Sequence, residues 1–356
     1  MERYTDLHTH SVASDGTKTP TELVLLAKEA GLTSIALTDH DTIDGLKEFK
    51  EAGETYGIET IPGIEFAAAY KNTELHIVGL FIDTENKKLL ESMEFIVKER
   101  NERNEKMIKA LNRLGMDITL EELEENAGGN IITRAHYANV LVKKGYVKNK
   151  DEAFSRYISS GKPGYVKRET LTPENCIKLI REAGGVPVLA HATLYNFNYL
   201  DIFNLVGELK GYGLMGMETI YSTYTKKQEE EMRKTCEHYK LIQSGGSDFH
   251  GENKPDISIG IGRGNLRIPQ EFAENMKKDG IPFPHMYLAC GLDDPLLPPN
   301  RKFRDTMQKL GVDVTYEEGP GAHEWDFWNR YIKKVLDWLP LDKDSKEGMN
   351  SGNVGL

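Results

Sequence analysis

The segment Arg3–Gly16 reads RYTDLHTHSVASDG and places a short apolar strand directly before two histidines separated by one residue. Side chains alternate along a strand with a period of two, so His8 and His10 point to the same side. The segment Ser34–Thr42, SIALTDHDT, repeats the pattern of an apolar strand followed by acids and a histidine. Between them, Pro20–Ala30 has the periodicity of an amphipathic helix. The chain therefore begins as strand, helix, strand.

The same alternation continues through most of the sequence. Strands are predicted at Arg3–Leu7, Ser34–Thr38, Glu59–Ile64, Leu75–Phe81, Val186–Ala190, Leu214–Ile220 and Leu241–Ser244, and further helices at Asp44–Tyr56 and Pro173–Ala183. Such alternation predicts an α/β fold with a parallel sheet, open or closed into a barrel. It stops between about residues 85 and 164, where the predicted helices are Asn86–Leu114, Leu120–Ala127, Arg134–Lys144 and Asp151–Ser159. We interpret this stretch as a helical insertion covering one end of the sheet.

The insertion is rich in basic side chains: Arg100, Arg103, Arg113, Arg134, Lys143, Lys144, Lys148 and Lys150. Acids are interspersed with them, so we interpret most of these charges as a solvated helix face.

Composition and charge exclude several classes of protein. Of the 356 residues, 39% are hydrophobic and 28% are charged, which is typical of a folded globular chain. The net charge of −11 opposes binding to extended duplex nucleic acid, although a small phosphorylated ligand at a local basic site is compatible with it. No segment approaches the ~18 apolar residues of a membrane span. The N-terminal MERYTDLHTH lacks the features of a secretory signal, so we expect a cytoplasmic protein without a membrane partner.

Six of the ten histidines fall at predicted strand ends, each near an acid. In a barrel these ends converge on one opening. The potential ligands are His8, His10, Asp15, His40, Glu65, His76, His191, Asp248 and His250. Nine ligands exceed the coordination sphere of one ion and predict two or three divalent ions. Mixed imidazole and carboxylate donors favour manganese first, with zinc, iron or magnesium as alternatives. The competing interpretation, buried histidines and helix caps, does not explain why they all fall at strand ends.

Five motifs, DLHTHSVASDG, TDHDT, GIEF, LAHA and GGSDFHG, resemble those of the polymerase and histidinol phosphatase (PHP) family of metal-dependent phosphoesterases. The resemblance covers about residues 1–281. The stretches ITRAH, KGYV, GKPGYV and GRGNL are most similar to those of bacterial 3′,5′-nucleoside bisphosphate phosphatases, relatives of which also trim RNA from its 5′ end. The resemblance implies a distorted (β/α)7 TIM-like barrel formed by residues 1–84 and 165–281, with residues 85–164 as a helical insertion that caps the substrate.

The resemblance also implies how the ligands divide. One ion would be held by His8, His10, Glu65 and Asp248, a second by Glu65, His76 and His191, and a third by Asp15, His40 and His250. The implied reaction is hydrolysis of a phosphate monoester by a metal-activated hydroxide. Arg134, His191 and Asp248 are expected to take part in catalysis. One departure is Ala192, which stands where relatives often carry proline and removes no ligand.

Substrate binding rests on fewer residues. The planar guanidinium of Arg134 is suited to a bidentate contact with a second phosphate of the substrate. The alternative role of Arg134 is a surface salt bridge. His136 is either a phosphate donor or a local helix cap. Lys162, Lys167 and Arg263 are weaker candidates, for which solvated surface is the alternative. Glu218 ends the one strand without a ligand and is expected to support the ligands from behind.

Residues 283–341 predict a strand, helix, strand, helix segment that resembles the last quarter of an α/β-hydrolase esterase. Asp294 stands at the position of the triad acid and His323 at that of the triad histidine. Such enzymes need a G-x-S-x-G nucleophile elbow, which the chain lacks, since Ser247 in GGSDF has no second glycine. We interpret the segment as catalytically silent, with exposed edges covered by the barrel or by a second copy in an oligomer. Residues 342–356 are expected to form a flexible tail.

Four functions compete at this point. The leading hypothesis is hydrolysis of the 3′-phosphate of 3′,5′-bisphosphonucleotides or of short RNA 5′ ends. Another phosphomonoester, such as histidinol phosphate, belongs to the same enzyme class. A serine esterase is disfavoured by the missing elbow. The last is a non-catalytic scaffold that metal ions stabilise.

Overall fold

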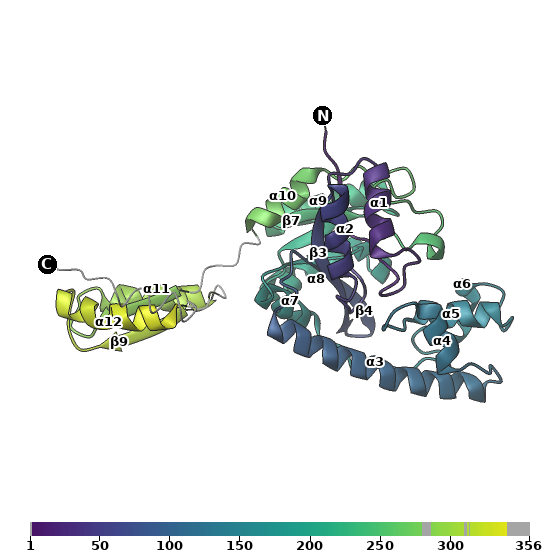
Figure 1. The fold of residues 1–356 in the computed structure, drawn as a ribbon, viewed down its shortest axis with the longest axis horizontal. Helices are drawn as coiled ribbons and strands as arrows, with labels where there is room; N and C mark the ends of the chain where they lie inside the picture. The colour runs from purple at the N-terminus through teal and green to yellow at the C-terminus, as the bar shows by residue number, and fades with distance from the viewer. Residues whose placement is uncertain (1, 280–285, 310–311, 313, 340–356) are drawn as a thin grey trace. The chain divides into compact units, whose positions relative to one another are not determined.

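A computed structural model of the chain describes residues 2–279, 286–309, 312 and 314–339, and the chain divides into two compact units, residues 1–281 and 282–356. The first unit holds a seven-stranded sheet in sequence order, shown in Figure 1. Its strands are β1 (Thr5–Asp6), β2 (Ser34–Leu37), β3 (Glu59–Tyr70), β4 (Thr73–Leu80), β5 (Val186–Leu189), β6 (Gly216–Tyr221) and β7 (Ile242–Gly246). The backbone N of Leu7 donates to the Gly245 carbonyl at 3.2 Å, which nearly closes the sheet. The predicted TIM-like α/β barrel is confirmed.

The prediction of a parallel sheet does not hold at β4, which pairs antiparallel with both β3 and β5. β3 runs on through Glu65 to Tyr70, and only Lys71 and Asn72 separate it from β4. Two residues are enough for a hairpin, whereas a parallel return needs a crossover of a dozen or more residues. The start of β4 therefore lies beside the end of β3, with His76 opposite Ala67.

Helices pack around this sheet. They are α1 (Pro20–Glu29), α2 (Leu46–Tyr56), α7 (Pro173–Glu182), α8 (Tyr199–Tyr212), α9 (Lys226–Tyr239) and α10 (Gln270–Asp279). The side chain of Thr19 caps α1 in a capping box with Glu22, and Gly57 ends α2 with a left-handed backbone. Leu23 and Phe49 on these helices are buried against the sheet core around Ile35. This burial fixes the strands whose ends carry the histidines.

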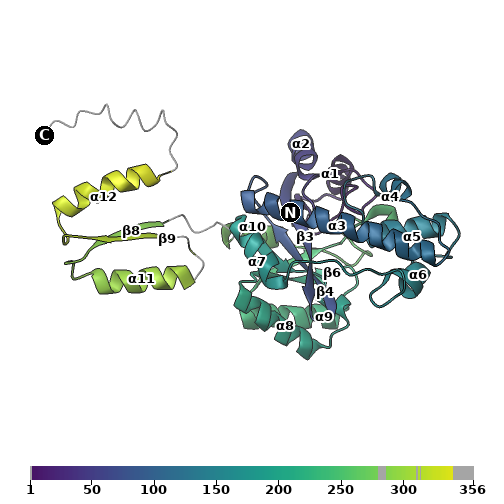
Figure 2. The same cartoon turned by 90° about the horizontal axis from the view of Figure 1, so that it is seen from below.

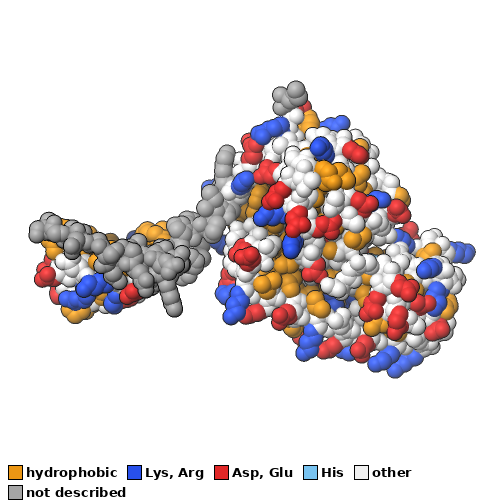
Figure 3. Space-filling view, in the orientation of Figure 1, with side chains coloured by type: hydrophobic (Ala, Val, Ile, Leu, Met, Phe, Trp, Pro, Cys, Tyr) orange, Lys and Arg blue, Asp and Glu red, His pale blue; other side chains and the backbone are white. Residues whose placement is uncertain are grey.

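The insertion between β4 and α7 has an apolar core of its own. α3 (Lys87–Arg113) extends from the barrel to a compact group formed by α4 (Leu120–Ala127), α5 (Arg134–Lys143) and α6 (Lys150–Ala153), which runs into a π-helical turn at Phe154–Ile158 (Figures 1 and 2). Leu111 and Tyr137 are fully buried in this core. Arg100 and Arg103 are only 5% and 6% exposed on α3, so the interpretation as solvated charge is wrong for both. On the face in Figure 3, acidic and basic side chains are interspersed.

The second unit contains β8 (Met286–Gly291), α11 (Leu297–Lys309), β9 (Val314–Gly319) and α12 (Trp325–Trp338). β8 and β9 pair in parallel, and Figure 2 shows α11 and α12 on opposite sides of them. Residues 283–285 and 340–341 of the predicted segment, and the predicted tail 342–356, lie outside the described residues. Among the helices that the structure describes, none combines the length and apolarity needed to cross a membrane.

Candidate metal centre

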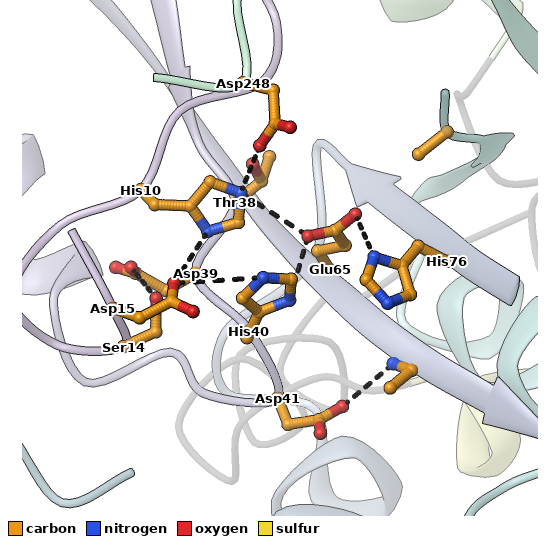
Figure 4. A network of polar contacts seen from close by, with 12 residues as sticks. His10, Ser14, Asp15, Thr38, Asp39, His40, Asp41, Glu65, His76 and Asp248 are labelled. Atoms are coloured by element: carbon orange, nitrogen blue, oxygen red, sulfur yellow. Dashed lines mark hydrogen bonds and ion pairs between the residues drawn. The ribbon is translucent and has the colours of Figure 1, made fainter. Parts of the chain in front are cut away.

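The carboxylate of Glu65, fully buried in β3, lies at the centre of the histidine cluster (Figure 4). The nearest imidazole nitrogens are Nδ1 of His40 and Nδ1 of His76 at 2.9 Å, Nε2 of His191 at 3.0 Å, and Nε2 of His8 and of His10 at 3.4 Å. A single carboxylate among five imidazoles is a strong centre for cations, because it offers one negative charge and the rings offer nitrogen donors.

Two further carboxylates extend the cluster. Oδ1 of Asp248 lies 3.3 Å from Nε2 of His10 and 3.3 Å from Nδ1 of His250, and Oδ1 of Asp15 lies 3.3 Å from Nε2 of His250. The structure thus brings all nine predicted ligands together. Four groups have ligand atoms within 4.8 Å of one another: His10, Asp15, His40 and His250; His8, Glu65 and His191; His8, His10 and Asp248; and His40, Glu65 and His76.

Local sequence explains how these side chains converge. A Cβ on Gly246 would lie 2.2 Å from Cβ of His8, so only glycine lets β7 approach the end of β1 this closely. Asp39 accepts hydrogen bonds from the backbone N of Ser11 at 2.8 Å and from Oγ of Ser14 at 2.5 Å, which folds the loop that presents Asp15.

The donor set fits divalent cations. Nδ1 of His10 and Nδ1 of His191 are buried without a hydrogen-bond partner in the described structure, and such atoms are costly unless something satisfies them. Nε2 of His8 lies only 3.1 Å from Nε2 of His10, an approach typical of two nitrogens that share a cation. Mixed imidazole and carboxylate ligation suits transition-metal ions.

Residues outside this set orient it. Oε1 of Glu218 lies 2.8 Å from Nδ1 of His8, which directs the Nε2 of that ring into the cluster, and Oε2 of Glu218 accepts from the backbone N of His191 at 2.5 Å. Oδ2 of Asp248 accepts from the Tyr221 hydroxyl at 2.6 Å and from Nζ of Lys254 at 2.5 Å. Oδ1 of Asp248 is left to face the histidines.

Charge is tightly coupled within the cluster. Burial works against ionisation of Glu65, but His40 and His76 outweigh it and hold the pKa of Glu65 well below its usual value. Burial also opposes charge on His76, yet Glu65 and Glu74 raise the pKa of this imidazole to about 10. Burial lowers the pKa of His10 well below its usual value, and the neighbouring His250 and His40 add to the effect.

A cavity of about 580 Å³ opens beside the cluster. Its walls come from the β3–β4 hairpin and the insertion, and Asp15, His40 and His76 line its inner side. Six cationic side chains also line it: Lys71, Arg100, Arg103, Arg134, Lys167 and Arg168. The cavity is therefore suited to an anion placed against the metal centre.

Arg100 and Arg168 share a single carboxylate, whereas Arg103 has no carboxylate partner in the described structure. Arg100 Nη2 and Arg168 Nη2 donate to Oδ2 of Asp41 at 2.5 and 2.7 Å. Arg103 makes no ion pair with a described carboxylate; its Nη2 donates to the Ile132 carbonyl at 2.7 Å, and its Nε has no hydrogen-bond partner. Burial, followed by the nearby charge of Arg100, lowers the pKa of Arg103 to about 9.

The predicted substrate residues are dispersed. Arg134 lines the cavity and its Nη2 donates to Oε1 of Glu74 at 2.8 Å, so its alternative role as a salt bridge is also met. Lys167 lines the cavity, whereas Lys162 and Arg263 do not, and Arg263 pairs with Asp256 at 2.6 Å. His136 is buried, and its Nδ1 accepts from the backbone N of Thr133 at 3.1 Å as a helix cap.

Sequence reasoning missed Arg103, Arg168, Asp41 and Lys254 as site residues. Arg103 occupies the same face of α3 as the buried Met107 and Leu111, and this spacing was the available signal. No local signal marks Arg168, because its partner Asp41 lies 127 residues away.

In the second unit, Nδ1 of His323 lies 3.3 Å from Oδ2 of Asp294. The Asp294 side chain is 6% exposed and the His323 side chain is 60% exposed. Ser247 is fully buried in the first unit. A carboxylate and a histidine are present, but a nucleophile elbow is not.

Comparisons with known proteins were made on this basis. A family model described as the PHP domain matches residues 6–160. A 5′-3′ exoribonuclease of Haemophilus influenzae is 36% identical over 250 residues, which is 70% of this chain and 91% of the relative. A 3′,5′-nucleoside bisphosphate phosphatase of Chromobacterium violaceum is 32% identical over 255 residues, 71% of this chain and 90% of the relative.

Two other likenesses are to a solved structure and to an esterase. The crystal structure of a putative metal-dependent phosphoesterase from Bifidobacterium adolescentis superposes with a TM-score of 0.70 at 27% identity, covering 78% of this chain and 97% of that one. An acetyl esterase of Caldicellulosiruptor saccharolyticus is 28% identical over 165 residues, 45% of this chain and 53% of the esterase. The nearly closed barrel, the clustered His, Asp and Glu side chains and the relatives agree: the chain belongs to the PHP family and is a metal-dependent phosphoester hydrolase.

Proposed function

We propose that this chain removes the 3′-phosphate from 3′,5′-bisphosphorylated nucleotides or acts on the 5′ ends of short RNA. The observation that carries the proposal is Arg103, a buried guanidinium that lines the cavity without a described carboxylate partner. A buried, unneutralised arginine is costly unless an anion meets it, and a phosphate accepts two of its hydrogen bonds. Because the metal centre takes the phosphate to be cleaved, an anion at Arg103 is a second phosphate of the same substrate.

The ligands of the ions would be the nine residues of the cluster, His8, His10, Asp15, His40, Glu65, His76, His191, Asp248 and His250. Their mixed donors support two or three ions, with manganese favoured and zinc, iron or magnesium as alternatives. When bound, such ions activate water and neutralise the charge of the phosphate. The protein's own part is orientation: Glu218 fixes the His8 ring, and Tyr221 and Lys254 fix Asp248.

The roles assigned to single residues follow from this arrangement. His191 and Asp248 would act in catalysis as ligands that face the cleaved phosphate. Arg134 forms an ion pair with Glu74, and the central carbon of its guanidinium lies 5.8 Å from the ring centre of Tyr165. It would orient the substrate at the cavity wall. Lys167 and Lys71 lie on the cavity lining, where a following phosphate of an oligonucleotide would extend.

The other functions are less well supported. Histidinol phosphate carries one phosphate and would leave Arg103 without an anion. The serine esterase lacks its elbow, and the non-catalytic scaffold does not account for a cationic cavity beside the cluster. His136, Lys162 and Arg263 stay untested as substrate contacts. A cytoplasmic location and an oligomer formed through the second unit also remain predictions.

The test compares two substrates in wild-type protein and in Arg103→Met. Phosphate release is followed with adenosine 3′,5′-bisphosphate, and with p-nitrophenyl phosphate as a substrate that has one phosphate. We expect manganese-dependent release that chelator abolishes. In the variant, KM for the bisphosphate should rise by about 10- to 100-fold, the loss of one charged hydrogen-bonding group, with little change for p-nitrophenyl phosphate.

Arg113→Met is the matched control, since Arg113 is an exposed arginine on the same helix that does not line the cavity. Equal losses on both substrates in Arg103→Met would mean that Arg103 supports the fold and not the second phosphate. Absence of release from the bisphosphate by the manganese-loaded wild type would remove the nucleotide assignment.

A further inference from the structure

The insertion contacts three loops of the barrel that together carry a single ligand group, with two of its members on the loop after β1 and one on each of the other loops. The group is His10, Asp15, His40 and His250, whose donor atoms lie within 4.8 Å of one another. By contrast, His8 and His191 of another group are both held by Glu218, which belongs to the barrel. The insertion therefore supports the first ligand group, whereas the barrel alone supports His8 and His191.

Asn253 makes the most direct connection. It ends the short 3-10 turn Gly251–Asn253, which follows His250 immediately. Its Nδ2 donates to the backbone carbonyl of Asp15 at 2.7 Å. Its Oδ1 accepts from Nζ of Lys150 on α6 at 2.7 Å and, at a longer 3.5 Å, from Nδ2 of Asn139 on α5. One side chain thus joins two helices of the insertion, α5 and α6, to the loops that carry Asp15 and His250.

The Asp15 loop has a second contact with the insertion, and the His40 loop has contacts of its own. A Cβ on Gly129, between α4 and α5, would lie 2.7 Å from the carbonyl oxygen of Val12, so the insertion backbone rests on the loop before Asp15. After His40, Asp41 binds Arg100 of α3, and Oδ2 of Asp44 accepts from Nδ2 of Asn130 at 3.0 Å. A shift of the insertion would therefore move all three loops.

We infer that Asn253 is a positioning residue that couples the insertion to the ion position formed by His10, Asp15, His40 and His250. The inference rests on the proposed function for the identity of the ligand, because Arg103 and Arg134 place the second phosphate against the insertion. A ligand that fixes the insertion increases the affinity of this position for its ion. The bound ion increases the affinity for the ligand by the same factor, since coupling between two sites is reciprocal. The group of His8, Glu65 and His191, which Glu218 supports, shares no ligand with this position and is outside the coupling.

The test uses metal binding, not turnover. Manganese bound per chain is measured by elemental analysis after equilibrium dialysis over a range of free manganese, with and without adenosine 5′-monophosphate as the probe. In wild-type protein we expect one manganese position to bind about five- to tenfold more tightly with the probe. In Asn253→Ala this position should weaken about tenfold, the loss of the hydrogen bonds of Asn253 to the loops, and the effect of the probe on it should shrink. The position formed by His8, Glu65 and His191 should be retained.

Two variants separate the possible causes. Lys150→Ala removes the shorter of the two contacts from the insertion to Asn253 and should reduce the effect of the probe. Lys148→Ala, an exposed lysine just before α6, should match wild type. Wild-type affinity at every manganese position and a wild-type response to the probe in Asn253→Ala would overturn the inference, as would an unaltered response in Lys150→Ala. If the probe fails to bind wild-type protein, the nucleotide assignment fails, whereas selective loss of one ion in Asn253→Ala would still support the positioning role.

Discussion

Both units pair a buried carboxylate with histidine, and they do so very differently. In the barrel, Glu65 is fully buried and five imidazoles lie within 3.4 Å of it. In the second unit, Asp294 has one imidazole partner, His323, which is largely exposed. Burial and convergence give the barrel site its coupled pKa values and its donor groups. An acid–histidine contact thus becomes a reactive centre only when the fold buries it and brings further ligands to it.

The largest expected effect comes from removing the central charge. Glu65→Gln should lower bound metal and reduce phosphatase activity by about 10³-fold, because transition-state charge stabilisation by metal ions is worth several kcal/mol. Metal content and turnover of adenosine 3′,5′-bisphosphate are the measurements. Asp294→Asn makes the same change in the second unit and should alter neither quantity. Full activity in a folded Glu65→Gln protein would contradict the cluster assignment.

A smaller effect is expected from Asp41, the carboxylate that holds Arg100 and Arg168. Burial opposes its charge, but these two arginines outweigh burial and lower its pKa from 3.8 to about 2. Because the pKa of Asp41 is lower in the folded protein than in the unfolded chain, its charge stabilises the fold at pH values above the pKa of the unfolded chain. This stabilisation is lost as the pH falls from about 4 towards 2. Asp41→Asn should therefore lower the free energy of unfolding by about 2 kcal/mol at pH 7.

Urea denaturation of the wild type and Asp41→Asn at pH 7 and near pH 2.5 measures this difference. The difference between the two free energies of unfolding should be smaller at the lower pH. Asp44→Asn, an exposed aspartate on the same loop, should cost less than about 0.5 kcal/mol at either pH. A gap that does not change with pH would mean that the arginines do not stabilise charged Asp41.

Metal binding should depend on pH at the barrel site. Neighbouring carboxylates raise the pKa of His76 to about 10 against the effect of burial, so this imidazole holds a proton at neutral pH. An ion must displace that proton, and manganese affinity should rise up to about tenfold for each pH unit between 6.5 and 7.5. Calorimetric titrations in buffers of different ionisation enthalpy would detect the released proton. A pH-independent affinity would contradict the coupling.

The smallest effect is expected in the second unit. A chain shortened to residues 1–282 should retain bisphosphate turnover within about twofold, and the full chain should not hydrolyse p-nitrophenyl butyrate, because a nucleophile elbow is missing. Loss of turnover in a folded, shortened protein would show that the second unit supports the site. Ester hydrolysis that survives chelator would restore the esterase alternative.

Much of the barrel could be predicted because its signals are local. His8 and His10 follow β1 directly with one residue between them, and each remaining predicted ligand follows or lies within an apolar strand. The hairpin of β3 and β4 was missed, since Lys71–Asn72 is not among the strongest turn sequences and the strand extends well beyond Ile64.

The cationic cavity could not be predicted in the same way. Arg100 reaches Asp41 across 59 residues and Arg168 reaches it across 127, so no spacing in the sequence relates them. Arg103 stands at a position in the helical periodicity where a buried residue is expected, but arginine side chains are usually exposed to solvent. Only the packing of the insertion against the barrel shows that this arginine is buried.

The reversed direction of β4 has a consequence for how this enzyme can diversify. Because β3 and β4 continue past the cluster as a hairpin, one wall of the cavity is sheet, lined by Ala67 and Ala69 at alternate positions of β3, with Lys71 in the turn that follows. A hydrogen-bonded wall tolerates changes of side chain more readily than changes of length. New substrate preferences on this side would therefore arise by substitution at alternate residues.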